Sequence, residues 1–143
     1  MEALFRGIYE HQLDDKGRLR IPAKFKKGLE SYPEQTYSFV RGLNGCIYVF
    51  PDSVLNDTLE ELSEERLSDA SKASLMFFSS VFPAEEDGQG RVTLPNRLKE
   101  AANIKKDIVT IGRGKRLEIW SAERYNEYVE GVNYDEEFRK LGI

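Results

Sequence analysis

Basic side chains are concentrated in one short stretch of the chain. Between residues 16 and 27 every charged residue is a base, and the six are Lys16, Arg18, Arg20, Lys24, Lys26 and Lys27. Arg18 and Arg20 are two residues apart, so both side chains leave the same face of an extended strand. A guanidinium group can donate paired hydrogen bonds to a phosphate or a guanine edge, and a lysine supplies a compact positive charge. The stretch is therefore typical of a surface that binds a polyanion.

Other kinds of site chemistry have few candidate residues. Cys46 is the only cysteine and His11 the only histidine. An internal disulfide and a Cys/His zinc site are therefore excluded, and a Ser-His-Asp site would have to use His11. We predict Cys46 to be a small buried side chain and His11 to be an ordinary strand residue. Gly88 to Gly90 and Gly112 to Gly114 lack the spacing of a phosphate-binding loop and are predicted to be turns. No catalytic residue, metal, cofactor or small-molecule substrate is expected.

The charge of the chain is acidic overall but unevenly distributed. The 143 residues carry a formal net charge of -4, which argues against a histone-like coating of nucleic acid through bulk charge. Residues 88–117 hold eight bases and two acids, whereas residues 51–87 hold two bases and ten acids. We therefore expect one positive face in acidic surroundings. No apolar run has the length of a signal peptide or a membrane span, so we expect a cytoplasmic protein without a membrane partner.

Two parts of the chain are copies of each other. Residues 13–29 align without a gap with residues 86–102, and residues 39–51 align with residues 109–121. The first alignment pairs an Asp, a Gly, an Arg and a Pro at the same spacing: Asp14, Gly17, Arg18 and Pro22 against Asp87, Gly90, Arg91 and Pro95. Two gapless matches in the same order indicate one supersecondary unit that is present twice.

Each copy begins with a turn, a short strand and a short helix. Asp14 and Asp87 are expected to cap the backbone amides of a tight turn, which Gly17 and Gly90 close with a positive φ. Alternating apolar residues after each glycine predict a half-buried strand. The proline that follows each strand ends it and suits the start of a helix.

Each copy continues with a hairpin and a longer helix. Residues 39–50 and 108–120 each contain two β-rich runs around glycine, which predicts two hairpins. Helices are predicted after Pro51 and after Ser121, the latter as an N-cap. The acidic run at residues 60–65 is predicted to be a solvated helix face.

The two copies define the expected domain organisation. The first unit spans residues 5–63 and the second spans residues 78–130. A linking helix is expected at about 64–80, and no structure is assigned to the polar tail at 131–143. Because each unit exposes an apolar face, the two are expected to pack together as one compact α+β domain.

The repeated residues resemble the bacterial MraZ family. The resemblance covers residues 5 to 130 and rests on Phe5-Arg6-Gly7, Leu13-Asp14-x-Lys16-Gly17-Arg18-Leu19-x-x-Pro22, Asp87-x-x-Gly90-Arg91 and Leu117-x-x-Trp120. It implies a pseudo-two-fold double swapped-hairpin β-barrel, like those of AbrB, SpoVT and MazE, with short peripheral helices. It also implies a ring-shaped homo-oligomer at the nucleoid. This oligomer would bind repeated boxes of double-stranded DNA in the promoter of its own operon, in the cell-division and cell-wall gene cluster.

The resemblance and the basic pattern together give the expected site residues. The expected DNA-binding residues are Arg18, Lys16, Arg20, Arg91, Lys24 and Arg6, and the expected turn residues are Asp14, Gly17, Asp87 and Gly90. In the second copy Gln89 replaces Lys16 and Thr93 replaces Arg20. We therefore predict that the first copy is the main DNA reader and that the second is largely architectural. Whether Arg6 contacts DNA or joins subunits stays open.

Alternatives to these assignments come from the same residues. Asp14 and Asp87 can each hold the arginine four residues on, which would leave its guanidinium less available to phosphate. Lys24, Lys26 and Lys27 can be merely the solvated face of a short helix. An antitoxin-like module that binds another protein is an alternative function, although such chains usually carry a long disordered tail. An enzyme is the third class, and the sequence offers no constellation of residues for it.

Overall fold

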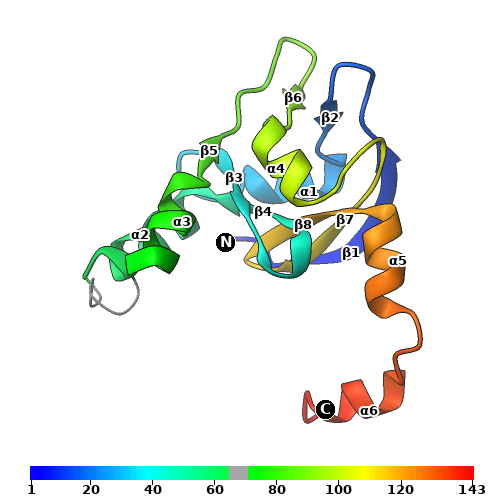
Figure 1. The fold of residues 1–143 in the computed structure, drawn as a ribbon. Helices are drawn as coiled ribbons and strands as arrows, with labels where there is room; N and C mark the ends of the chain where they lie inside the picture. Colours follow the sequence, from blue (N-terminus) through cyan, green and yellow to red (C-terminus); the bar gives the residue numbers. More distant parts are fainter. Residues whose placement is uncertain (65–70) are drawn as a thin grey trace.

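The computed structural model describes residues 1–64 and 71–143 (Figure 1). Its strands are β1 (Phe5–Gln12), β2 (Arg18–Arg20), β3 (Tyr37–Arg41), β4 (Ile47–Pro51), β5 (Phe82–Pro83), β6 (Arg91–Thr93), β7 (Asp107–Gly114) and β8 (Arg116–Ser121). Its helices are α1 (Ala23–Leu29), the 3-10 turn η1 (Leu43–Gly45), α2 (Asp52–Glu64), α3 (Ser71–Ser79), α4 (Asn96–Ala101), α5 (Ala122–Val129) and α6 (Tyr134–Arg139). The predicted α+β class is confirmed.

Six antiparallel strands form one sheet in the order β1-β7-β8-β4-β3-β5. The outer strands pair across the two copies, because β1 of the first copy pairs with β7 of the second and β5 of the second pairs with β3 of the first. At the centre of the sheet, β4 lies beside β8 with Tyr48 opposite Glu118. Exchanging the two copies reverses this order onto itself, so the sheet has an internal pseudo-two-fold axis at the Tyr48–Glu118 pair.

A second, two-stranded ribbon obeys the same symmetry. β2 and β6 pair antiparallel, with Leu19 opposite Val92, which is its equivalent in the other copy. The ribbon lies above α1, α4 and the six-stranded sheet in Figure 1. The side chains of Leu19 and Val92 are 2% and 1% exposed and belong to the main core. Each strand of the ribbon therefore depends on the other copy for its hydrogen bonds.

The predicted closed β-barrel is not formed by the described residues. The ribbon and the larger sheet are separate sheets, and the isolated bridge between Glu86 and Val92 spans the second turn without joining them. The reason is local, because Pro22 and Pro95 follow each three-residue strand closely and lack the amide proton that a longer ladder needs. The two sheets pack across a shared core instead of joining edge to edge.

The short helices α1 and α4 begin directly after these prolines. Pro22 and Pro95 are their N-cap residues, one position earlier than a first helical residue. In α1, Phe25 and Leu29 are one turn apart and both are buried, while Leu98 is buried in α4. Each helix thus packs its apolar side into the core and leaves its lysines toward solvent.

Both predicted hairpins are present, as β3–β4 and β7–β8. The predicted turn at Gly112 to Gly114 was wrong for Gly112, which lies inside β7 opposite Gly7 of β1. A Cβ atom at Gly112 would collide with the backbone of Phe5 and Arg6. Position 112 therefore requires glycine because a neighbouring strand approaches it closely, and not because the chain turns there.

The remaining helices follow the predicted boundaries in part. Helix α2 begins after Pro51, and the Ser121 hydroxyl caps α5 by accepting a hydrogen bond from the Arg124 amide at 3.3 Å. The predicted linking helix is described only as α3, since residues 65–70 lie outside the described part of the chain. Helix α6 forms in the tail, where no structure was predicted, and Asn133 caps it. The boundaries of the two units stay predictions.

The two faces of the ribbon are expected to respond differently to mutation. Leu19→Ala removes a buried side chain from the core, so we expect the free energy of unfolding to fall by about 2–5 kcal/mol. Arg20→Ala, on the opposite and exposed face, should change it by less than about 0.5 kcal/mol. Urea unfolding of both variants measures the difference. A loss for Leu19→Ala as small as the one expected for Arg20→Ala would show that Leu19 is not a core residue.

Candidate nucleic-acid interface

Asp14 organises the turn that leads into β2. Its Oδ1 atom accepts hydrogen bonds from the backbone amides of Lys16 and Arg18, both at 2.9 Å. Its Oδ2 atom accepts a hydrogen bond from the Arg18 Nε atom at 2.7 Å. Gly17 closes the turn with a φ of 74°. One carboxylate therefore fixes both the backbone of the turn and the direction of an arginine side chain.

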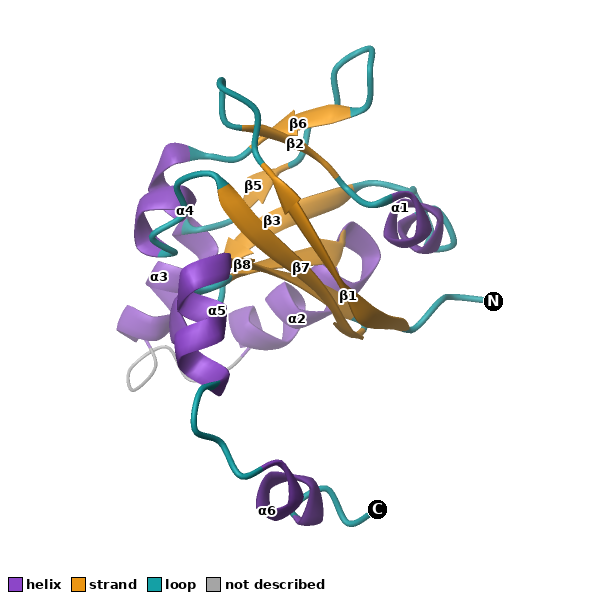
Figure 2. Cartoon of the chain, turned by 90° about the vertical axis from the view of Figure 1, so that its right-hand side faces the viewer, coloured by secondary structure: helices purple, strands orange, loops and turns teal. Residues whose placement is uncertain are grey.

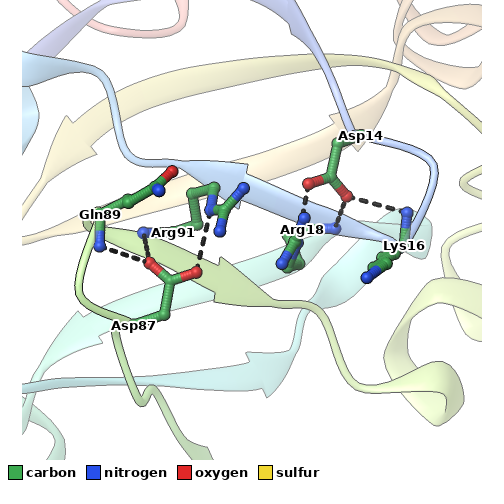
Figure 3. A network of polar contacts seen from close by, with 6 residues as sticks. All are labelled: Asp14, Lys16, Arg18, Asp87, Gln89 and Arg91. Carbon is green, nitrogen blue, oxygen red and sulfur yellow. Dashed lines mark hydrogen bonds and ion pairs between the residues drawn. The ribbon is translucent and has the colours of Figure 1, made fainter.

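The second copy repeats this turn almost atom for atom, as Figure 3 shows. Asp87 accepts hydrogen bonds from the amides of Gln89 and Arg91 at 2.8 and 2.9 Å, and from the Arg91 Nε atom at 2.9 Å. Gly90 has a φ of 77°. In Figure 3 the two turns lie at opposite ends of the ribbon, with Arg18 and Arg91 between them.

Hydrogen bonding keeps both aspartates ionised. The backbone amide of Arg18, assisted by its guanidinium and by the Lys16 amide, lowers the pKa of Asp14 below its usual value. The backbone amides of Arg91 and Gln89, together with the Arg91 guanidinium, lower the pKa of Asp87 to about 2. Both turns therefore keep their Asp–Arg ion pairs throughout the physiological pH range.

The outward face of the ribbon carries three arginines. Arg18 and Arg20 alternate with buried Leu19, and Arg91 and Thr93 alternate with buried Val92. Arg20 lies directly opposite Arg91, and Arg18 lies opposite Thr93. Like charges placed opposite each other repel, and the Asp87 carboxylate beside Arg91 offsets part of that repulsion. The result is a compact cationic surface on a two-stranded ribbon.

Lys99 adds a positive charge from the other copy to the first turn. The ammonium group of Lys99, on α4, lies so close to Gly17 that a Cβ atom at that glycine would be 3.1 Å from Nζ. Its equivalent in the first copy is Lys26, whose Nζ atom lies 3.0 Å from the Glu86 carboxylate. The position equivalent to Glu86 in the first copy is Leu13, which is buried and uncharged.

The two turns therefore differ in charge more than their own sequences indicate. Beside the first turn, Lys16 is exposed and Lys99 is near. Beside the second, Gln89 is neutral and Lys26 is paired with Glu86. The alignment of residues 13–29 with residues 86–102 pairs Lys26 with Lys99, but Lys99 is not among the expected site residues. Only the crossing of α4 toward the first turn makes it a candidate.

Two predicted site residues lie away from the ribbon. Arg6 and Lys24 line a common groove with Phe5 and Gly28 near the N-terminus. Arg6 stands near the start of β1, roughly 20 Å of strand before the turn at Asp14. The structure thus brings Lys16, Arg18, Arg20 and Arg91 to the ribbon, but it does not bring Arg6 and Lys24 there.

The positive charge expected on a single face is divided between two places. The tip of the β7–β8 hairpin carries Arg113 and Arg116, which both donate hydrogen bonds to the buried Glu118 carboxylate. Trp120 Nε1 also donates to Glu118, at 3.1 Å. The β7–β8 tip is far along β7 from the residues next to the Asp14 turn. The expectation of one positive face was therefore wrong for this part of residues 88–117.

Known proteins are similar to this chain over most of its length. The family model described as "MraZ protein, putative antitoxin-like" matches residues 4–78 and 77–140. The chain belongs to the MraZ family. A protein of Natranaerobius thermophilus named transcriptional regulator MraZ is 41% identical, over 87% of this chain and 86% of its own length. A protein of Clostridium beijerinckii with the same name is 40% identical, over 98% of this chain and 100% of its own length.

Cys46 and His11 are the other residues of this MraZ chain that could take part in site chemistry, and each has a structural role. The Cys46 side chain is buried, and burial together with the nearby Glu118 carboxylate raises the pKa of its thiol to about 12. The His11 ring lies in β1 and makes a 2.7 Å hydrogen bond to the Thr110 hydroxyl, and burial lowers its pKa. Both side chains are placed as predicted. In the described part of the chain, no cluster of potential metal ligands occurs and no helix is long and apolar enough to cross a bilayer.

The lowered pKa of Asp87 predicts how the stability of the folded protein changes with acid. The folded-state pKa of Asp87 is below its unfolded value, so its contribution to stability is present above about pH 4 and is lost as pH falls toward about 2. We expect Asp87→Asn to weaken this part of the pH dependence, measured by urea unfolding between pH 2 and pH 6. Asp15→Asn removes one exposed carboxylate from the first turn but none of the hydrogen bonds of Asp87, and is the matched control. An unchanged acid profile in Asp87→Asn would refute the role of the carboxylate.

Proposed function

We propose that the chain is a sequence-specific DNA-binding transcriptional regulator. In this proposal it is cytoplasmic and nucleoid-associated, and binds repeated boxes in the promoter of its own cell-division and cell-wall gene cluster. A ring-shaped homo-oligomer built on the swapped-hairpin plan presents the ribbon of each subunit to DNA. The observation that supports this proposal most directly is that Arg18, Arg20 and Arg91 lie together on one face of the ribbon. The names of the relatives, which are transcriptional regulators, support the same conclusion.

The ion pair with Asp14 orients Arg18 without occupying its whole guanidinium. The hydrogen bond to the carboxylate uses Nε, so the two terminal NH2 groups remain for an outside acceptor. An arginine that is already held in one direction loses little side-chain entropy when it binds. Arg18 therefore supplies bidentate contacts to a guanine edge or a phosphate in our proposal, and Asp14 acts as a positioning residue.

The ribbon has a suitable shape for duplex DNA. A two-stranded β-ribbon can enter the major groove, where the base pairs present distinct patterns of donors and acceptors. Arg18, Arg20 and Arg91 are placed to read bases or to contact the backbone beside them. Lys16 and Lys99, near the first turn, contribute phosphate contacts that do not depend on sequence. The first copy is therefore the stronger reader, and the second completes the ribbon.

One subunit offers few phosphate contacts, so self-association is part of the proposal. Linking several ribbons makes the second and later contacts intramolecular, which raises the overall affinity without any new contact within a subunit. Repeated boxes in the promoter would provide the matching set of sites.

Arg18→Ala is expected to abolish binding to the protein's own promoter. The loss of one bidentate contact costs about 1–3 kcal/mol per subunit. This corresponds to about fivefold to about 150-fold in affinity, and each engaged subunit adds its own loss. Arg91→Ala should weaken binding less. Gel-shift titration measures both, with Arg139→Ala on α6 as the matched control and light scattering to follow the oligomer.

Two results would contradict this proposal. If Arg18→Ala broke the oligomer into smaller species, Arg18 would have a structural role. If the unaltered protein did not prefer its own promoter over unrelated DNA, sequence-specific regulation would be wrong.

The salt dependence of binding tests the difference between the two lysines. A lysine that contacts a phosphate releases counterions, so Lys99→Ala should lower the slope of log affinity against log salt by about one for each engaged subunit. Lys26→Ala should change the slope less, because Lys26 is paired with Glu86. Gel shifts at several salt concentrations give both slopes. If Lys99→Ala had the same slope as the unaltered protein, Lys99 would not contact a phosphate.

A further inference from the structure

Helix α6 stands apart from the rest of the molecule. Figures 1 and 2 both show it beyond α5, away from the two sheets. Every residue from Asn126 to Ile143 is exposed. Tyr134 and Phe138 are 69% and 40% exposed and lie one turn apart on one side of α6, and Leu141, in the turn that follows the helix, is 67% exposed. The tail therefore presents an apolar stripe that residues 1–64 and 71–143 of its own chain do not cover.

An isolated helix of this length needs a partner to be stable. Helices shorter than about 12 residues are marginal in water, since nucleation is unfavourable and few hydrogen bonds follow. α6 has six residues, an Asn133 cap and a stack of the Tyr134 and Phe138 rings at 4.9 Å. These local interactions are weak compared with the burial of three large side chains. The stripe is thus suited to packing into an apolar groove.

A groove of this kind lies between α3 and the β3–β4 hairpin. It has a volume of about 440 Å³ and is lined by Leu43, Tyr48, Met76 and Phe77, with Arg41 beside them. Leu43 and Met76 are 73% and 58% exposed. Contiguous exposed apolar residues with a polar rim mark an interaction surface. The occupant that fits has an apolar stripe and complementary charge.

The charges of the helix and of the groove are opposite. Arg41 and Arg97 lie together with Met76 along the neighbouring part of the same surface. α6 carries acids in its first turn, and at 100° per residue Asp135 and Glu137 flank the apolar stripe on its two sides. When the stripe enters the groove, these carboxylates are placed to meet the arginines at the rim.

The structure assigns this groove to α6 of a second copy of the chain. α6 is joined to α5 by only a few residues, and α5 and α3 lie at opposite sides of the domain in Figure 1. Residues 130–133 extend at most about 14 Å, so a second copy is the better placed donor of the helix. Helix and groove are different surfaces, and the contact is therefore head-to-tail. Contacts of this type repeat from subunit to subunit and close into a ring or continue as a filament.

This inference rests on the self-association proposed above. Disulfide cross-linking between chains that carry different cysteine substitutions tests it. Chains carrying Ala73→Cys in the groove are co-expressed with chains carrying Leu141→Cys on the stripe, and the mixture is oxidised. We expect a disulfide-linked dimer that contains one chain of each kind. Arg139→Cys, on the other side of α6, replaces Leu141→Cys in the matched control and should not give that dimer. The native Cys46 is buried and unreactive, so it does not interfere.

A second variant measures the contribution of the contact. Phe138→Asp introduces a charge into the stripe, and we expect light scattering to show a fall from the oligomer toward the 16.5 kDa monomer. Circular dichroism checks that the variant remains folded. Equal cross-linking from Arg139→Cys, or a bond within one chain when both cysteines are on it, would overturn the contact.

The outcomes separate this contact from the proposed function. If the unaltered chain is a monomer, both the self-association and the contact are wrong. If the unaltered chain is an oligomer whose mass Phe138→Asp does not change, only the contact is wrong. Loss of sequence preference in gel shifts with an intact oligomer would contradict the regulator and leave the contact standing.

Discussion

Neither strand of the β2–β6 ribbon can complete its hydrogen bonds within its own copy of the repeat. Backbone amides and carbonyls need partners when they leave water, and here the other copy supplies them. The same dependence holds at β1–β7 and β3–β5 in the larger sheet. The two copies must therefore fold together. This mutual pairing places Leu19 and Val92 inward, and by the alternation of a strand it places the arginines outward.

The aspartate of each turn connects this architecture to the chemistry of the ribbon. One carboxylate oxygen holds the backbone of the turn, and the other holds the arginine that begins the strand. The ion pair reduces the net charge at the ribbon but fixes the direction of the guanidinium. Direction is more useful than charge alone for reading bases, since a bidentate contact needs a defined plane. The repeated Asp-x-x-Gly-Arg spacing encodes both functions in five residues.

The sequence was sufficient for the local elements and insufficient for contacts between the copies. The alternation around Leu19 and the glycine-centred hairpins could be predicted, because turn chemistry and side-chain period are local properties. The position of Lys99 against Gly17 could not, since the two residues meet only when α4 crosses to the other copy. Glu118 was also missed, because a carboxylate buried beneath two arginines and a tryptophan has no signal in its own strand pattern. Gly112 was assigned to a turn because its reason, the approach of β1, is non-local.

Duplication within one chain allows the two halves of the ribbon to diverge. In a dimer of identical chains, a change beside one turn would appear beside the other. Here Leu13 and Glu86 occupy equivalent positions, so the lysine near the first turn remains available while its counterpart is neutralised. The ribbon face therefore has a direction, even though its backbone is nearly symmetric. In the proposed head-to-tail assembly, that direction would be kept from one subunit to the next. Such an assembly would match boxes repeated in the same orientation, whereas a palindrome would place half of the ribbons the wrong way round.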